Sequence, residues 1–136
     1  MKIFSDSLSV STNKRNELVD ITDKIQNLVD KAGISDGNVI VFCPHTTAAI
    51  TINENADPDV VGDILLTLAE LLPQDRNGYR HSEGNSDAHV KSSIIGCSET
   101  ILISSGKMKL GTWQGIYFCE FDGPRRRTVN VQITGE

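Results

Sequence analysis

All three histidines of this chain lie in short segments that are rich in polar side chains. His81 and His89 bracket the segment HSEGNSDAH, and His45 begins the segment HTTAAITINE. Neutral imidazole is the commonest metal ligand in proteins, and three imidazoles can hold zinc while a fourth position stays open for water. We therefore predict a site shared by His45, His81 and His89, with a divalent metal such as zinc as its candidate cofactor. A surface or hydrogen-bonded role for each histidine is the competing interpretation.

Three carboxylates lie close to these histidines in the sequence: Glu54, Asp87 and Glu120. Such a carboxylate can orient an imidazole or transfer a proton. For Asp87, a solvated surface charge is the simpler interpretation. Glu120 interrupts the apolar run IYFCEF and shares one strand face with Ile116 and Phe118. We expect it either at the end of a strand or paired inside a pocket.

The segment from Gly111 to Arg127 adds an amide and three adjacent guanidinium groups. Gln114 could bind a ligand or satisfy a neighbouring backbone group. Arg125 and its two successors suit bidentate binding of phosphate or carboxylate, and strand alternation directs the middle one to the opposite face. Exposed strand charges or ion pairs with Glu120 and Asp122 are the alternative.

Composition indicates one ordinary globular domain that spans residues 1–136, with 38% hydrophobic and 23% charged residues. The net charge of −5 argues against a nucleic-acid-binding surface over the whole domain. The chain has neither the P-loop pattern GxxxxGK[ST] nor the dinucleotide pattern GxGxxG, which argues against nucleotide chemistry of those kinds. No apolar run is long enough to span a membrane, so no membrane partner is expected.

The three cysteines form no CxxC pair, and each follows or interrupts an apolar stretch. We interpret Cys43, Cys97 and Cys119 as buried free thiols, with zinc ligation as the less favoured alternative. Unpaired cysteines suit a reducing compartment, and the N-terminal residues lack the pattern of a secretory signal. We expect a cytoplasmic protein.

Periodicity predicts the order of the secondary-structure elements. Residues 2–10 and 17–21 alternate and are interpreted as a hairpin, followed by a helix that Thr22 caps and Gly33 ends. The run NVIVFCP predicts a strand that is buried on both faces, and residues 46–52 predict the next strand. Asp57 and Pro58 open the most regular helix, which Pro73 ends.

Residues 73–85 contain the turn formers expected of a long irregular loop, and such loops are usually functional or mobile. A short helix through Ile95 and three strands follow, near 98–104, 112–121 and 126–134. The resulting order β-β-α-β-β-α-α-β-β-β lacks strict βα alternation. It predicts an α+β fold with about three helices and a mixed, mostly antiparallel sheet, curled into a barrel-like sandwich.

The motifs HTTAAITINE, HSEGNSDAHVKSSIIG and GTWQGIYFCEFDGPRRR resemble, in order and spacing, the small YjbQ-like proteins, a family often described as secondary thiamine-phosphate synthases. The resemblance covers nearly the whole chain. It implies a single α+β domain, a homotrimer whose motif residues gather in a cleft, and a weak thiamine-phosphate synthase activity. That reaction joins a thiazole phosphate to an aminomethyl-pyrimidine diphosphate and releases pyrophosphate.

The resemblance also implies which residues form the site. They are His45, Asn53 and Glu54 in the first motif, His81, Asn85 and His89 in the second, and Gln114, Glu120 and Arg125 in the third. We assign the catalytic role to Glu54, Glu120 and His89. Substrate binding is assigned to Asn53, Asn85, Gln114 and Arg125, and metal binding to the three histidines. The sequence thus favours a small enzyme that acts on a phosphorylated or anionic molecule, and a non-catalytic metabolite-binding or regulatory module is the alternative.

Overall fold

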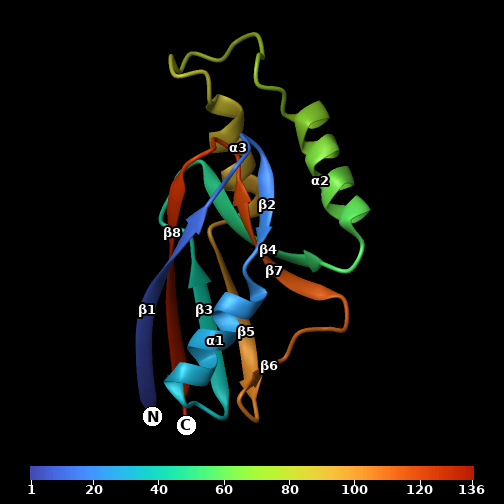
Figure 1. The fold of residues 1–136 in the computed structure, drawn as a ribbon. Helices are drawn as coiled ribbons and strands as arrows, with labels where there is room; N and C mark the ends of the chain where they lie inside the picture. The colour runs from blue at the N-terminus through green and yellow to red at the C-terminus, as the bar shows by residue number, and fades with distance from the viewer.

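The computed structural model describes residues 1–136 and has the predicted α+β class (Figure 1). Its elements are β1 (Lys2–Ser11), β2 (Glu17–Asp20), α1 (Thr22–Ala32), β3 (Gly37–Phe42), β4 (Ala48–Glu54), α2 (Pro58–Leu71), α3 (Ser86–Ile95), β5 (Ser98–Ser104), β6 (Lys107–Met108), β7 (Gln114–Glu120) and β8 (Arg126–Gly135). This is the predicted order with one additional short strand, β6. The predicted fold class is therefore confirmed.

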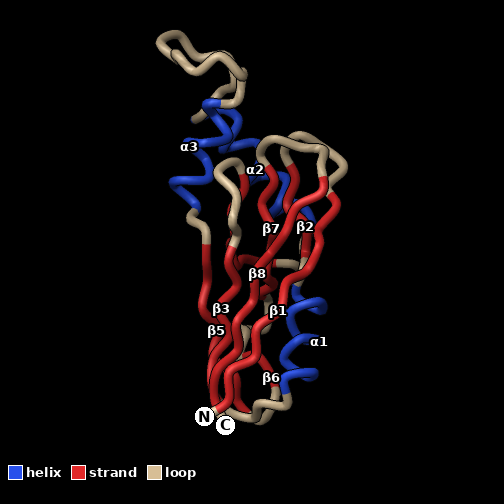
Figure 2. The backbone as a smooth tube through the Cα atoms, turned by 90° about the vertical axis from the view of Figure 1, so that its left-hand side faces the viewer, coloured by secondary structure: helices blue, strands red, loops and turns tan.

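The strands form two antiparallel sheets, with orders β1-β8-β3-β5-β6 and β2-β7-β4, which together curl into a half-barrel (Figure 2). The predicted hairpin between residues 2–10 and 17–21 is wrong. β1 pairs with β8 in the larger sheet, whereas β2 pairs with β7 in the smaller one. The connection between β1 and β2 therefore carries the chain from one sheet to the other, and local alternation contains no information about those distant partners.

Alternation along the strands builds the core between the sheets and α1. In β8, Arg127, Val129, Val131 and Ile133 are buried while the residues between them face solvent. A cluster of 17 buried hydrophobic residues fills the interior, with Phe118 fully buried among them. The sheets thereby hold the ends of β4, β7 and β8 in fixed positions.

The helix ends follow local sequence signals. Asp57 accepts a hydrogen bond from the amide of Asp59 at 2.9 Å, and Pro58 occupies the first turn of α2, as predicted. At α1 the predicted cap is shifted, because the carboxylate of Asp20 accepts from the amide and hydroxyl of Thr22 at 2.9 and 2.6 Å. Thr22 is thus the first helical residue rather than the cap.

Two predictions of burial are wrong within the single chain. β3 alternates instead of being buried on both faces, so Ile40 and Phe42 are 39% and 40% exposed. Cys97 is exposed, while Cys43 and Cys119 are buried free thiols as expected. In each case exposure depends on what packs against the segment, which its own residues do not specify.

Helix α2 stands apart from the body of the molecule (Figure 1). None of its residues is buried, although it carries the regular apolar stripe that the sequence shows. Amphipathic helices normally bury such a stripe against another element. Val61 and Leu68 of α2 pack against a small buried cluster that includes Tyr117 and Phe121, and the rest of the stripe stays only partly buried. None of the helices combines the length and apolar character that crossing a membrane requires.

We expect Phe118→Ala to lower the free energy of unfolding by about 3–5 kcal/mol, because it removes a fully buried aromatic side chain and leaves a cavity. Phe42→Ala is the matched control, because Phe42 is 40% exposed, and its cost should stay below about 1 kcal/mol. Urea denaturation of both variants measures the difference. Equal losses would contradict this description of the core.

Candidate functional site

Three adjacent cavities follow α3 and bring the three histidines to one groove. The His45 cavity, about 370 Å³, is lined by His45, Thr46, Ala48, His89, Ser92, Ser93, Gly96 and Cys97. The His81 cavity, about 420 Å³, is lined by Tyr79, His81, Ser86, His89 and Val90. The Arg76 cavity, about 310 Å³, is lined by Gln74, Asp75, Arg76, Asn77, Tyr79, His81, Gly84 and Ser86. Because neighbouring cavities share residues, we treat them as one α3 groove.

His81 and His89 lie next to each other in this groove. Their rings are perpendicular, with centroids 5.4 Å apart. His81 is exposed, and its Nε2 lies 3.5 Å from the carboxylate of Glu83. His89 projects from α3 and contributes to two cavities. It therefore occupies the central position of the groove.

His45 is held by the backbone of β8. Its Nε2 lies 3.0 Å from the amide nitrogen of Thr128, which donates to it, and 3.2 Å from the carbonyl oxygen of the same residue. Nδ1 is therefore the nitrogen left for a ligand, as an N–H donor in one tautomer and as a lone pair in the other. Burial and the nearby positive charge of Arg127 lower the pKa of His45, so the neutral form prevails at pH 7.

The single chain does not assemble a complete metal site. No group of three His, Cys, Asp or Glu side chains comes close enough to hold one ion. His81 and His89 provide two adjacent imidazoles, whereas the Nε2 of His45 is occupied by Thr128. A site with three protein ligands would need a third donor from outside this arrangement.

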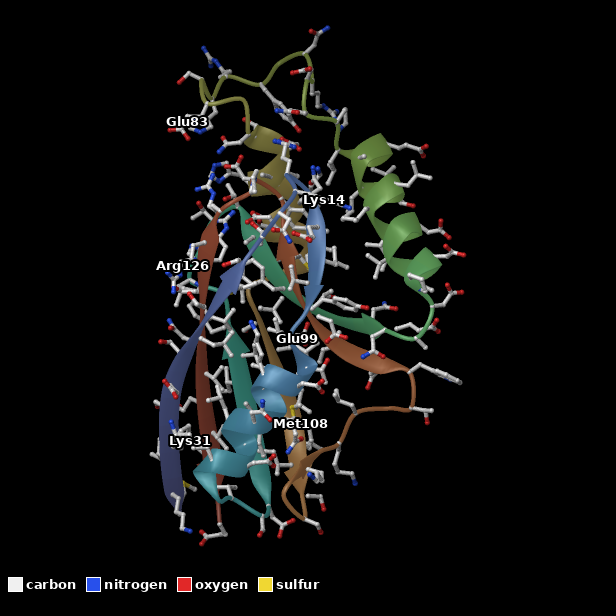
Figure 3. The ribbon with its side chains drawn as sticks, in the orientation of Figure 1. Lys14, Lys31, Glu83, Glu99, Met108 and Arg126 are labelled. Carbon is white, nitrogen blue, oxygen red and sulfur yellow. The ribbon has the colours of Figure 1, made fainter.

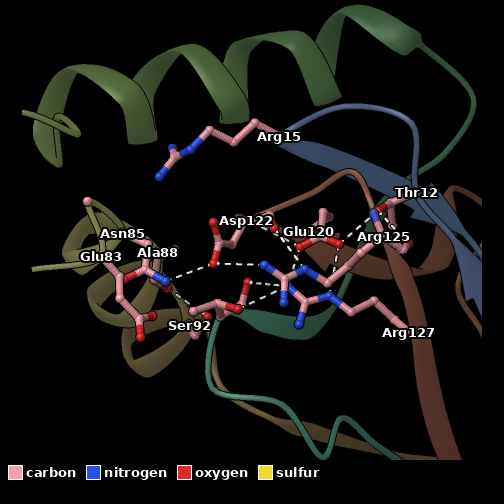
Figure 4. Close-up of polar contacts among 12 residues, drawn as sticks. Thr12, Arg15, Glu83, Asn85, Ala88, Ser92, Glu120, Asp122, Arg125 and Arg127 are labelled. Atoms are coloured by element: carbon pink, nitrogen blue, oxygen red, sulfur yellow. Dashed lines mark hydrogen bonds and ion pairs between the residues drawn. The ribbon is translucent and has the colours of Figure 1, made fainter.

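Glu120, at the end of β7, is fully buried, and Figure 4 shows its polar contacts. Its carboxylate pairs with the guanidinium of Arg127 and accepts from the hydroxyl of Thr12 at 2.8 Å and from the amide of Asp122 at 3.0 Å. Burial by itself would raise the pKa of Glu120, but these donors outweigh it and lower the pKa. Arg127 also donates to the hydroxyl of Thr47 at 2.9 Å. With no exposed atom, Glu120 does not line any of the cavities.

A second buried charge cluster anchors α3. Asp87 is fully buried and receives two hydrogen bonds from Arg15, at 2.9 and 3.0 Å, and one from Lys91 at 2.9 Å. Burial would raise the pKa of Asp87, but the paired cations lower it. Lys91 also donates to Asn16 at 3.1 Å. The surface interpretation of Asp87 is therefore wrong, because the loop between β1 and β2 covers it.

Asn85 connects α3 to the turn between β7 and β8 (Figure 4). Its amide nitrogen donates to Asp122 at 2.8 Å, and the same carboxylate accepts from Arg125 at 3.1 Å. Arg125 is thereby directed toward Asp122. The side-chain oxygen of Asn85 is buried and has no donor in the structure. Such an unpaired acceptor favours a bound water or a ligand donor at this position.

The remaining predicted site residues lie at the other end of the smaller sheet. β4 and β7 pair Ala48 with Glu120 at one end and Glu54 with Gln114 at the other. Six residue steps separate these positions, which is about 20 Å along a strand. Asn53 lies beside Glu54, and the side-chain oxygen of Gln114 accepts from the amide of Gly111 at 2.8 Å. Within one chain these three residues are therefore remote from the histidines.

Three residues that hold the site together were not predicted as members: Arg15, Lys91 and Arg127. Two of them had a signal in the sequence. Lys91 follows Asp87 at the i,i+4 spacing of helical ion pairs, and Arg127 alternates in phase with Val129. Arg15 had none, because its contact with Asp87 spans 72 residues.

We expect the free energy of unfolding to fall as the pH drops below the ordinary pKa values of Asp87 and Glu120, 3.8 and 4.5. Both pKa values are lower in the folded chain than in the unfolded chain. The two carboxylates therefore stabilise the folded state fully at pH values above their unfolded-state pKa values. This stabilisation is lost as the pH falls through their folded-state pKa values. Asp87→Asn should cost roughly 3–5 kcal/mol at pH 7, because two cations lose their buried partner, and should flatten this acid dependence. Urea denaturation between pH 3 and pH 7 provides the measurement.

Glu83→Gln is the control for this experiment, since Glu83 is an exposed carboxylate of the same region. It should leave both the stability at pH 7 and the acid slope unchanged. An Asp87→Asn variant with the wild-type slope would show that Asp87 does not carry the acid sensitivity.

Comparison with known proteins gives consistent matches over nearly the whole chain. A family model described as "UPF0047 protein YjbQ-like" matches residues 6–136. A UPF0047 protein of Methanocaldococcus jannaschii is 57% identical over 93% of this chain and 91% of its own length. The UPF0047 protein YugU of Bacillus subtilis is 50% identical over 95% of this chain and 98% of its own.

Solved structures give the same result. An uncharacterised protein of the YjbQ/UPF0047 family from Clostridium acetobutylicum has a TM-score of 0.93 and 55% identity, covering 95% of this chain and 99% of its own. A protein of unknown function from Sulfolobus solfataricus has a TM-score of 0.95 and 38% identity, covering 99% of each chain. These descriptions name no reaction.

Proposed function

The chain belongs to the YjbQ-like UPF0047 family, and we propose that it is a small enzyme whose α3 groove acts on a phosphorylated or anionic small molecule. The observation that supports this proposal is the gathering of all three histidines along one groove. An imidazole side chain can donate or accept a proton at neutral pH and can bind an anion when it is charged. We place this activity in the cytoplasm.

The candidate reaction is the weak thiamine-phosphate synthase activity that the family resemblance implies. A bond forms between the thiazole nitrogen and the methylene carbon of the pyrimidine diphosphate, the carbon–oxygen bond breaks, and pyrophosphate leaves. Departure of pyrophosphate requires donors for its developing charge. His89, at the centre of the groove, is the proposed proton donor, and Arg76 is the only guanidinium among the lining residues. Glu120 then positions Arg127 and β8.

A binding or regulatory module is the second candidate, and the position of the carboxylates favours it. Glu120 is sealed in an ion pair, and Glu54 lies at the far end of the sheet. Within one chain the groove consequently has no carboxylate from the predicted catalytic set. Such a groove can hold an anion without transferring protons to it.

A homotrimer is the proposed partner arrangement. Residues 48–72 carry five carboxylates and no lysine or arginine. Lys14, in the loop between β1 and β2, and Arg126, at the start of β8, are basic residues outside this segment (Figure 3). A head-to-tail assembly would bring these opposite charges together and cover the apolar face of α2, and it could place Glu54 and Gln114 near a neighbouring groove.

We expect the purified protein to have three times the 14.9 kDa mass of one chain in solution. Ile64→Lys should convert it to a monomer, because it places a charge on the partly exposed apolar stripe of α2. Lys107→Gln, at an exposed position of β6 outside residues 48–72, is the control and should leave the mass unchanged. Light scattering coupled to size exclusion measures both. A monomeric wild type would contradict the trimer, and a trimeric Ile64→Lys variant would exclude α2 from the interface.

His89→Ala should lower the rate of thiamine phosphate formation roughly a hundredfold if His89 transfers the proton. The assay combines the purified protein with the thiazole phosphate and the pyrimidine diphosphate and follows both products. Thr100→Ala, on the exposed face of β5, is the control. An unchanged rate in His89→Ala would exclude this residue from catalysis.

The same preparations separate the two candidate functions. The binding module would be established by two results together. The wild type would bind inorganic pyrophosphate but form no product, and His89→Ala and His81→Ala would each weaken that binding. Titration with zinc chloride tests the metal: His81→Ala should weaken zinc binding at least tenfold if the paired imidazoles are ligands. Zinc affinity that survives this change would exclude a metal at His81.

A further inference from the structure

The two ends of the α3 groove differ in charge. Arg76 lines one end, and it forms no ion pair in the structure. Two carboxylates lie nearby, but neither pairs with Arg76: Asp75 lines the same cavity and forms no ion pair, and Glu83 contacts His81. The guanidinium of Arg76 is therefore the cationic group at this end that has no carboxylate partner and can pair with a ligand anion.

The direction of α3 reinforces the difference. Ser86, the first residue of α3, lines the Arg76 cavity, whereas Gly96, directly after its last residue, lines the His45 cavity. The aligned peptide dipoles of a helix place partial positive charge at its N-terminus and partial negative charge at its C-terminus. An anion is thus favoured at the Arg76 end and disfavoured at the His45 end.

The two serine hydroxyls of the His45 cavity have their hydrogens engaged. Ser92 donates to the carbonyl of Ala88 and Ser93 to that of His89, each at 2.8 Å. A serine hydroxyl has one hydrogen and two lone pairs, so both oxygens are left as acceptors. No lysine, arginine or carboxylate lines this cavity. It therefore suits an uncharged or amino group that donates hydrogen bonds.

We propose that the groove binds one elongated ligand in a single direction, with its anionic group at Arg76 and a hydrogen-bond-donating hydroxyl or amino group at Ser92 and Ser93. This inference rests on the proposed function and narrows its substrate class to molecules that carry an anion at one end and a donor at the other. Ser92 and Ser93 lie six and seven residues after Ser86, so the two groups are separated by about 10 Å along α3. His89 then faces the middle of the ligand.

The reverse orientation is physically unfavourable. A phosphate at Ser92 and Ser93 would face hydroxyl lone pairs and the negative end of α3, with no guanidinium among the lining residues. In that orientation the hydroxyl or amino group of the ligand would lie at Arg76, whose guanidinium would then have no anion to pair with.

Two matched probes test the orientation: octyl phosphate and 8-hydroxyoctyl phosphate, which differ only in a terminal hydroxyl. By isothermal titration calorimetry the wild type should bind the hydroxylated probe about fivefold more tightly, the effect of one additional hydrogen bond. Arg76→Met should weaken both probes about tenfold, because a charge-assisted contact is lost. A combined Ser92→Ala and Ser93→Ala variant should abolish the preference and leave the affinity for octyl phosphate unchanged.

Arg80→Met and Ser82→Ala are the matched controls, since both residues are exposed and lie outside the groove lining. Neither should alter the binding of either probe. The orientation would be overturned if the wild type bound the two probes equally, or if Arg80→Met had as large an effect as Arg76→Met. Either result would leave the proposal of an anion-binding groove unaffected. Failure of both probes to bind, together with failure of pyrophosphate to bind, would overturn the proposed function as well.

Discussion

The compensation of two buried carboxylates is the constraint on which the rest of this structure depends. Asp87 and Glu120 are both fully buried, and each would be strongly unfavourable as an isolated charge. Arg15 and Lys91 compensate the first, and Arg127 compensates the second. These pairs join a loop, a helix and two strands that are far apart in the sequence. The groove is therefore built on charges that hold their positions only while the fold is intact.

This arrangement explains how a short helix can carry a functional surface. α3 has no strong amphipathic pattern, and its buried residues include Asp87 and Lys91, so apolar burial does little to fix it. Ion pairs and the contact between Asn85 and Asp122 orient it instead. Hydrogen-bonded ion pairs are directional, whereas apolar contacts are not. The position of His89 in the groove follows from that directionality.

The uncovered surfaces of the molecule agree with the proposed assembly. α2 buries none of its residues fully and exposes Leu66 and Leu71, and β3 exposes Ile40 and Phe42. The predicted site residues are divided between the two ends of the smaller sheet, and this division also agrees with an assembly of several chains. Asn53, Glu54 and Gln114 belong to motifs as distinctive as those of the histidines, yet a single chain separates them. An assembled trimer would account for both observations.

The sequence by itself determined the order of strands and helices, the caps at Asp57 and Gly33, and the polar motifs that contain the histidines. These features depend on neighbouring residues, through alternation, helical periodicity and the conformational preferences of proline and glycine. Only the tertiary structure decided that β1 and β2 belong to different sheets, that Cys97 is exposed and that Asp87 is buried. The physical reason is that strand pairing, burial and charge compensation each require a partner distant along the chain, and local sequence does not identify that partner.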